Sequence, residues 1–254
     1  MEITFLGTGT SQGIPVIGSD HPVCKSENPK DTRLRVSVLL EWEDASYVID
    51  CGPDFREQML HNGVSKLDGI LLTHEHSDHT AGIDDIRPFC FKQGNIPFYA
   101  EKRVFESLHR RFDYIFVTEN KYPGAPTIDE VEISKDSTFS IGGKQVIVVQ
   151  AFHNKLPVLG FRVGDFTYLT DVKTMEKDEI DKIRGTEVLV VNCLRETEHE
   201  SHFNLNEALA FIADVQPKKA YLTHISHLLG FHDEVDASLP PGVYLAYDNL
   251  QIKL

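Results

Sequence analysis

The chain has 254 residues, which is long enough to bury a sizeable hydrophobic core, so its length sets few limits on the fold. Lys and Arg number 25 against 39 for Asp and Glu, and the net charge of −14 excludes the basic footprint that binds a long nucleic acid. Because no apolar run is long enough to span a membrane and Met1 leads straight into a short alternating segment, we expect a soluble, cytoplasmic protein with a small substrate and no membrane partner.

Short β-branched and apolar runs recur along the whole chain. They predict strands at residues 3–7, 35–42, 46–50, 69–73, 96–100, 145–152, 158–163, 166–170, 187–191, 219–223 and 243–247. Amphipathic stretches predict helices at 53–63, 102–112, 175–185 and 205–215, with Gly63 and Gly185 placed to end two of them. Residues 117–130 contain two prolines and a glycine and predict a surface loop. The class is mixed α and β, and we expect one domain over residues 1–254.

The four cysteines are widely separated in the chain, at Cys24, Cys51, Cys90 and Cys193. Without a secretory signal, a disulfide framework is not expected, and these side chains are predicted to be small buried hydrophobes.

Three predicted strands end in similar sequences. GILLTH ends at His74, FTYLTD ends at Asp171 and KAYLTH ends at His224. In sheets whose strands alternate with helices, sites are built at the carboxyl ends of strands, because the strand holds the side chain while the loop leaves it accessible. We expect these three ends to converge.

The segment GILLTHEHSDHTAG, residues 69–82, places His74, His76, Asp78 and His79 within six positions. Alternate residues of an extended segment point the same way, so the first two histidines can hold one ion while the other pair faces a second. Imidazoles mixed with a carboxylate suit Zn, Fe or Mn and are typical of a hydrolytic two-metal site. Four donors are too few to complete the coordination of two ions. The candidates for the missing ligands are His153, Asp171 and His224.

The motif THEHSDH, together with those three distant candidates, resembles the metallo-β-lactamase superfamily over essentially the whole chain. The resemblance implies an αββα four-layer sandwich of two sheets between layers of helices. It also implies the following ligand sets: His74, His76 and His153 on one divalent ion, Asp78, His79 and His224 on the other, and Asp171 bridging both. Asp50, in VIDCG, matches an aspartate that supports the ligands from behind.

Segments outside the motif are similar to a subgroup, the phosphoribosyl cyclic phosphate phosphodiesterases. These segments are GTGTSQGIPVIGSDHPVC, CGPDFR, LPVLGFRVG and the last part of the chain from LTHISHLLGFHDEV onward. The subgroup implies a cytoplasmic homodimer that hydrolyses a small cyclic phosphodiester, by attack of a hydroxide shared by two zinc or manganese ions. It further implies that His202 is the general acid for the leaving alkoxide, with His199 as a nearby rival.

The same subgroup carries a third, structural zinc. The matching positions here are His21, Cys24 and His227, but Ser19 and His21 stand where cysteines are expected. Because a serine is a poor zinc ligand, Asp20 or a water molecule would have to complete the site. Arg56 and Arg87 are candidates to bind a substrate phosphate through paired hydrogen bonds.

Two other functions of the same fold stay open as alternatives. One is an endoribonuclease that trims transfer-RNA 3′ ends, although the acidic chain lacks a basic arm for RNA. The other is a non-catalytic carrier protein of cofactor biosynthesis, although all seven metal-ligand positions are retained. Redox members carry a glutamate at the second ligand position, where this chain has His76, and lactam or thioester hydrolysis is compatible with the ligands alone.

Overall fold

The computed structural model describes residues 1–254 and contains two seven-stranded sheets packed face to face. The first sheet has, in spatial order, β14 (Gln251–Lys253), β1 (Glu2–Gly7), β2 (Ser37–Trp42), β3 (Ala45–Ile49), β4 (Gly69–Leu71), β5 (Ile96–Ala100) and β6 (Ile128–Glu132). The second has β13 (Val243–Leu245), β12 (Lys219–Thr223), β11 (Val188–Asn192), β10 (Phe166–Tyr168), β9 (Leu156–Val163), β8 (Lys144–His153) and β7 (Thr138–Ile141).

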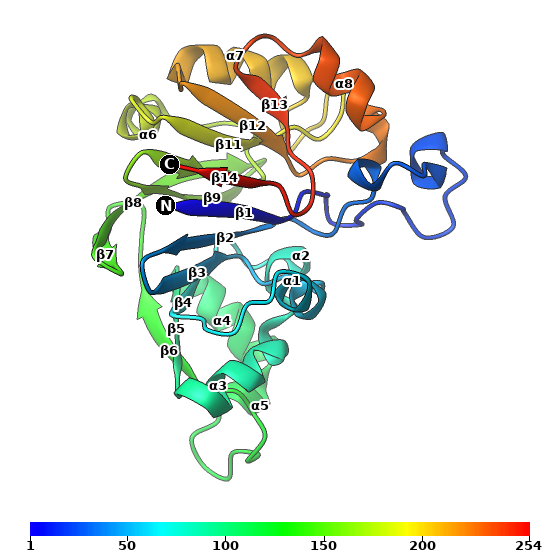
Figure 1. Cartoon of the computed structure of the whole chain (residues 1–254). Coiled ribbons are helices and arrows are strands. Elements are labelled where there is room, and N and C mark those ends of the chain that lie inside the picture. The colour runs from blue at the N-terminus through cyan, green and yellow to red at the C-terminus, as the bar shows by residue number, and fades with distance from the viewer.

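Helices cover the outer face of each sheet (Figure 1). The first sheet is covered by α1 (Phe55–His61), α2 (Ser77–Thr80), α3 (Arg87–Gln93), α4 (Lys102–Arg111) and α5 (Asp113–Phe116). The second is covered by α6 (Lys177–Ile183), α7 (Leu205–Val215) and α8 (His232–Ser238). The expected αββα sandwich is therefore confirmed, and none of the helices combines the length and the apolar composition that a membrane span requires.

The alternation of side chains along the strands produces these layers. In β2, Val38 and Leu40 point into the core between the two sheets, whereas Leu39 packs into the core beneath the helices. All three side chains are buried, and burying each one stabilises the fold by about 1.5–3 kcal/mol. Shifting the pairing by one residue would turn every side chain to the opposite face, so the hydrophobic pattern specifies the register.

The predicted elements agree with the structure except where the apolar pattern is weak. Every predicted strand is present, and the four predicted helices correspond to α1, α4, α6 and α7. Gly63 and Gly185 have φ of +63° and +77°, as expected beyond helix ends. The predicted loop over 117–130 is wrong at its end, because residues 128–130 begin the edge strand β6. That strand is almost wholly exposed, so it carries no apolar alternation to reveal it.

The four cysteines are free, and only Cys24 is partly exposed. The predicted burial holds for Cys51, Cys90 and Cys193, but not for Cys24.

A buried polar network joins the first loop of the chain to its last segment. The Arg33 guanidinium donates to Thr8 Oγ1 at 2.7 Å, to the Ala246 carbonyl at 2.6 Å and to His232 Nδ1 at 3.0 Å. Asp248 accepts hydrogen bonds from the Thr8 hydroxyl and the Leu34 amide, both at 2.6 Å. Burial, followed by the neighbouring Arg33, lowers the pKa of His232 to about 4, and burial raises the pKa of Asp248 to about 6.

The shifted pKa of His232 predicts an acid-sensitive contribution to stability. The unfolded chain binds a proton near pH 6.5 but the folded chain only near pH 4, so this contribution is present above pH 6.5 and is lost as the pH falls towards 4. Between pH 7 and 4.5, the free energy of unfolding of the wild type should fall by about 1–2 kcal/mol more than that of His232→Gln, because water partly screens the shift. Urea unfolding at several pH values measures the difference. Asp248 also titrates in this range, but its contribution is common to both proteins and cancels in the comparison. The prediction would be contradicted if the free energy of unfolding changed with pH in the same way in both proteins.

Candidate metal centre

The carboxyl ends of several strands meet at one edge of the sandwich and deliver the candidate site residues. β3 and β4 run parallel in the first sheet, and β10, β11 and β12 run parallel in the second. Asp50, Asp171 and His224 follow three of these strands, and all three adopt the left-handed conformation, with φ of +64°, +57° and +55°. Non-glycine residues seldom adopt this conformation, and when they do they cluster at functional sites, because it turns the side chain sharply out of the strand.

Asp50 and Thr73 orient the histidines of the loop after β4. His79 Nδ1 donates to Asp50 Oδ2 at 2.7 Å, and Asp50 also accepts from the Thr73 amide and hydroxyl, each at 2.8 Å. Because that hydroxyl proton goes to Asp50, the Thr73 oxygen is left to accept from His74 Nδ1 at 3.1 Å. Nε2 of both histidines therefore faces the centre of the cluster and is the nitrogen placed to bind a metal there.

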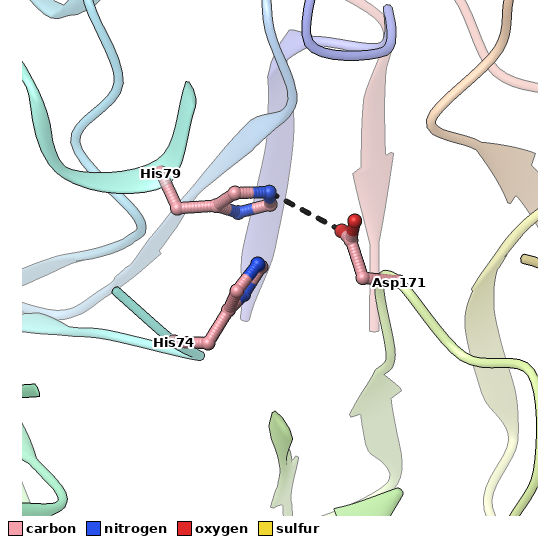
Figure 2. A group of neighbouring side chains, drawn as sticks. All are labelled: His74, His79 and Asp171. Atoms are coloured by element: carbon pink, nitrogen blue, oxygen red, sulfur yellow. Dashed lines mark ion pairs between the residues drawn. The ribbon is translucent and has the colours of Figure 1, made fainter. Parts of the chain in front are cut away.

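Asp171 lies at the middle of the cluster. Its Oδ2 is 3.2 Å from His79 Nε2 and 3.4 Å from His224 Nε2, and its Oδ1 is 3.0 Å from His202 Nε2. Figure 2 shows His74 and His79 on one side and Asp171, from the opposite sheet, directed towards them. The site therefore lies between the two sheets.

Asp78 extends the cluster on the side of His79 and His224. Asp78 Oδ2 lies 3.2 Å from His79 Nε2 and 3.7 Å from His224 Nε2. Gly52 makes this approach possible, because a Cβ at that position would come within 2.0 Å of the Asp78 carbonyl oxygen.

His153 and His76 complete the other side of the cluster. His153 Nδ1 donates to the Ser201 carbonyl at 2.9 Å, which leaves Nε2 free as a ligand. Its ring centroid is 5.3 Å from that of His76 and 6.0 Å from that of His74. His76 is the most exposed of these histidines, and its nitrogens are not part of the tightest groups of donors. The structure thus brings together all seven side chains that the sequence singled out as metal ligands.

His202 lies at the edge of the cluster, in the segment between β11 and α7. The Phe203 amide donates to the Val172 carbonyl at 2.8 Å, which holds this segment against the residues following Asp171. Asn204 then begins α7 with a capping box that includes Glu207. His202 Nδ1 faces the Ser201 hydroxyl at 3.1 Å and His199 at 3.2 Å, while Nε2 faces Asp171.

The electrostatics of the cluster follow from burial and from its carboxylates. Burial lowers the pKa of His74 well below its usual value and lowers that of His202, although Asp171 opposes the second shift. Burial also disfavours the charged form of His79, but Asp78, Asp171 and Asp50 outweigh it and hold the pKa of His79 well above its usual value. Against the effect of burial, His224 and His79 hold the pKa of Asp171 far below its usual value, and His79 and His224 do the same for Asp78.

The donors fit divalent metal ions. Nε2 of His74, His79 and His224 is buried without a hydrogen-bond partner, and each such orphaned nitrogen costs about 1–3 kcal/mol unless something binds it. Three close groups of donors overlap at His79 and Asp171: His74, His79 and Asp171; Asp78, His79 and His224; and His153, Asp171 and His202. Imidazole and carboxylate together suit zinc or manganese, so a metal accounts for nitrogens that the protein alone leaves unpaired.

The two arginines predicted to bind phosphate lie away from this cluster. Arg56 lines a separate cavity of about 430 Å³ with Met59, Phe89 and Lys92, and none of the seven candidate ligands lines it. Arg87 donates to Asp84 at 3.0 Å through Nε. Neither arginine forms a hydrogen bond or an ion pair with a side chain of the cluster, so the phosphate-binding role has no structural support.

The proposed structural zinc site is only partly assembled. The rings of His21 and His227 lie edge to face with centroids 4.9 Å apart. Cys24 Sγ accepts a hydrogen bond from the Val16 amide at 3.5 Å, and Ser19 Oγ accepts from the His21 amide at 3.2 Å. Asp20, the alternative ligand, forms an exposed ion pair with Lys25 at 2.7 Å. All close groups of metal-binding side chains belong to the main cluster, so the third zinc ion stays a prediction.

Sequence reasoning missed the residues that orient the ligands. Thr73 and Ser201 were not singled out, and neither was Arg103, which lies on α4 and contacts the residue between His74 and His76. Each acts through a hydrogen bond between segments distant in the chain, and no spacing pattern signals such a bond.

Comparison with known proteins places this site in a family. A model of the beta-lactamase superfamily domain matches residues 46–225. An octanoyltransferase of Porphyromonas gingivalis is 37% identical over 253 residues, which cover 99% of this chain and 51% of that protein. A ribonuclease Z of Bacillus licheniformis is 28% identical over 65% of this chain and 49% of its own length. The chain therefore spans about half the length of the curated relatives it matches.

Solved structures agree with the fold. A diphosphatase of the PhnP family superimposes with a TM-score of 0.92 at 35% identity, covering 99% of this chain and 96% of that one. Zinc-bound PqqB from Methylobacterium extorquens superimposes with a TM-score of 0.80 over the full length of both chains, but at 17% identity it supports the fold alone.

Proposed function

This chain belongs to the metallo-β-lactamase superfamily, and from that membership we propose that it is a metal-dependent phosphodiesterase acting on a small, cyclic phosphodiester. The observation that carries the proposal is the convergence of the candidate metal ligands with His202, whose Nε2 lies 3.0 Å from Asp171. The close groups of donors contain six of the seven candidates and His202, and the ring of His76 lies beside that of His74. A set of ligands with a proton donor beside it is what hydrolysis of an ester with a poor leaving group requires.

The ligand sets that the family resemblance implies divide the seven side chains between two ions, and each ion would take ligands from both sheets. One ion would be held by His74, His76 and His153. The other ion would be held by Asp78, His79 and His224, and Asp171 would contribute to both sites. Two such cations, zinc or manganese, would lower the pKa of water to about 7 and take up charge on the phosphoryl oxygens.

The side chains of the protein supply orientation and a proton. Asp50 and Thr73 fix the rings of His79 and His74, so their Nε2 atoms need no reorganisation when the substrate arrives. His202 would donate its proton from Nε2 to the leaving alkoxide, and the nearby Asp171 carboxylate stabilises its protonated form. No covalent enzyme intermediate is needed.

The relatives support hydrolysis of a phosphoryl group but differ in their substrates. A diphosphatase cleaves a P–O–P bond and a phosphodiesterase a P–O–C bond, and in both water attacks a phosphorus atom that carries an oxygen leaving group. The ribonuclease Z match is less extensive, and the net charge of −14 disfavours a long RNA. We do not extend acyl transfer to this chain, because it spans only half of the octanoyltransferase.

A substrate panel tests the proposal. The metal-loaded protein should hydrolyse bis(p-nitrophenyl) phosphate in the presence of Mn or Zn, with kcat/KM at least about a hundredfold above that for nitrocefin or lactoylglutathione. A five-membered cyclic phosphodiester, a disubstituted diphosphate and a precursor tRNA complete the panel. Preference for the lactam or the thioester would reject phosphoryl chemistry. Preference for the precursor tRNA would replace the small substrate with RNA, and preference for the diphosphate would move the proposal to diphosphatase activity.

A further inference from the structure

Arg103 connects two parts of the metal centre that belong to different sheets. It lies on α4, and its Nη1 donates to the carboxylate of Glu75, the residue between His74 and His76. Its Nη2 donates to the carbonyl oxygen of Pro157, the second residue of strand β9. The side chain of Arg103 is only 27% exposed and that of Glu75 only 24%, so both contacts are largely shielded from water.

The two acceptors lie next to ligands of the same predicted ion. Glu75 belongs to the loop over residues 74–79, which we call the histidine loop. Pro157 pairs with Phe152 across the β8–β9 hairpin, one residue before His153. Arg103 is therefore a direct link between the histidine loop of the first sheet and the hairpin of the second.

Glu101 holds the Arg103 side chain in position, and no other side chain joins the histidine loop to the hairpin. Arg103 Nε donates to Glu101 Oε2 at 2.9 Å, which holds the guanidinium plane in place. Apart from Arg103, the backbone bond from the Leu159 amide to the Thr73 carbonyl, at 2.9 Å, joins the same two strand regions, but it lies on the far side of His74. The loop beyond that histidine, which carries His76, relies on Arg103 for its connection to the hairpin.

We propose that Arg103 is a positioning residue that fixes the histidine loop relative to the β8–β9 hairpin, and so sets the spacing between His76 and His153. The two ring centroids are 5.3 Å apart, and no hydrogen bond joins the two side chains. The inference rests on the metal centre of the proposed function and names the group that assembles one half of it.

A lysine could not replace this arginine. The planar guanidinium reaches a carboxylate, a carbonyl and a second carboxylate in three directions at once, whereas an ammonium group is a point charge on a flexible stem. Asp78 and His79 belong to the histidine loop, but neither they nor His224 contact Arg103, and Asp50 holds His79 independently. The effect of replacing Arg103 should therefore be confined to one metal position.

Zinc titration of the metal-free protein against a competing chelator tests the proposal without any substrate. Arg103→Met should weaken one of two binding steps by about 10–100-fold, the range seen when a group that orients a ligand is removed. The other step should stay within about twofold of the wild type. Arg103→Lys should lose most of the same affinity, and Glu75→Gln should weaken the same step to a smaller extent.

The matched control is Arg110→Met, which removes an exposed arginine from the same helix that forms no hydrogen bond or ion pair. It should bind zinc as the wild type does. In a His153→Ala background, adding Arg103→Met should cause no further loss, because the ligand that Arg103 positions is already gone. Thermal unfolding of the metal-free proteins separates the proposal from a general packing role.

Three results would overturn the proposal. They are equal weakening of both zinc steps, full affinity in Arg103→Lys, and a lowered unfolding midpoint of metal-free Arg103→Met with unchanged zinc affinity. Failure of the proposed phosphodiesterase activity would look different, since a wild type that binds two ions but hydrolyses no phosphodiester leaves the Arg103 titration intact.

Discussion

Asp171→Asn should abolish hydrolysis, with kcat/KM for a phosphodiester falling by at least about 10³-fold. The Asp171 carboxylate lies within 3.4 Å of Nε2 of His79, His224 and His202. The amide has the same shape but no charge, so it cannot balance two cations, and its NH₂ group would be turned towards imidazole nitrogens or away from the ions. The protein should also lose at least one equivalent of metal, measured by elemental analysis after gel filtration.

The control for this variant is Asp136→Asn, the same change at an exposed surface position outside the cluster. It should keep the metal content and activity of the wild type. Full metal content together with full activity in Asp171→Asn would remove Asp171 from the centre and, with it, the assignment of the seven ligands.

His202→Ala should slow hydrolysis to an extent that depends on the leaving group. An alkoxide needs a proton as it departs, so turnover of a cyclic or dialkyl phosphodiester should fall by about 10²–10⁴-fold. Nitrophenolate is stable without a proton, so turnover of bis(p-nitrophenyl) phosphate should fall by less than about tenfold. Comparing kcat for the two esters in the same preparation measures the difference and cancels any change in the amount of active protein.

His199→Ala is the matched test of the rival acid. His199 is more exposed and contacts His202 through Nδ1 at 3.2 Å, but it makes no contact with Asp171. The His199→Ala substitution should slow hydrolysis of both esters slightly and to the same extent. Equal slowing of both esters by His202→Ala would remove that residue from the acid role, and selective slowing by His199→Ala would transfer the role to its neighbour.

The positions of the arginines differ from those expected from the sequence. The residue type of Arg56 and Arg87 suits phosphate, yet one lines a separate cavity and the other pairs with Asp84. Arg103 attracted no attention, yet it contacts the histidine loop. The charge of an arginine is visible in the sequence, but its partners depend on which segments pack together, so residue type alone does not show which arginines lie beside the site.

The strands and helices divide in a similar way. β8 and β9 are long and apolar and were predicted within two residues at each end, because their alternation reflects burial on both faces. β6 is an exposed edge strand, and α2 has only four residues, so neither carries an apolar pattern of its own. Both form because neighbouring elements supply hydrogen-bond partners to their backbones.

The sequence by itself determined the fold class, most of the elements and the seven candidate donors. These follow from local patterns: hydrophobic alternation, a dense group of histidines, and a ligand at the end of each of three similar strands. Only the tertiary structure decided how the donors are oriented. The left-handed backbone of Asp171 and His224 turns their side chains towards the other donors. The contact of Asp50 with His79 and the link made by Arg103 join segments far apart in the chain. Their geometry arises when the two sheets pack, because that packing sets the distances between side chains that the order of residues leaves free.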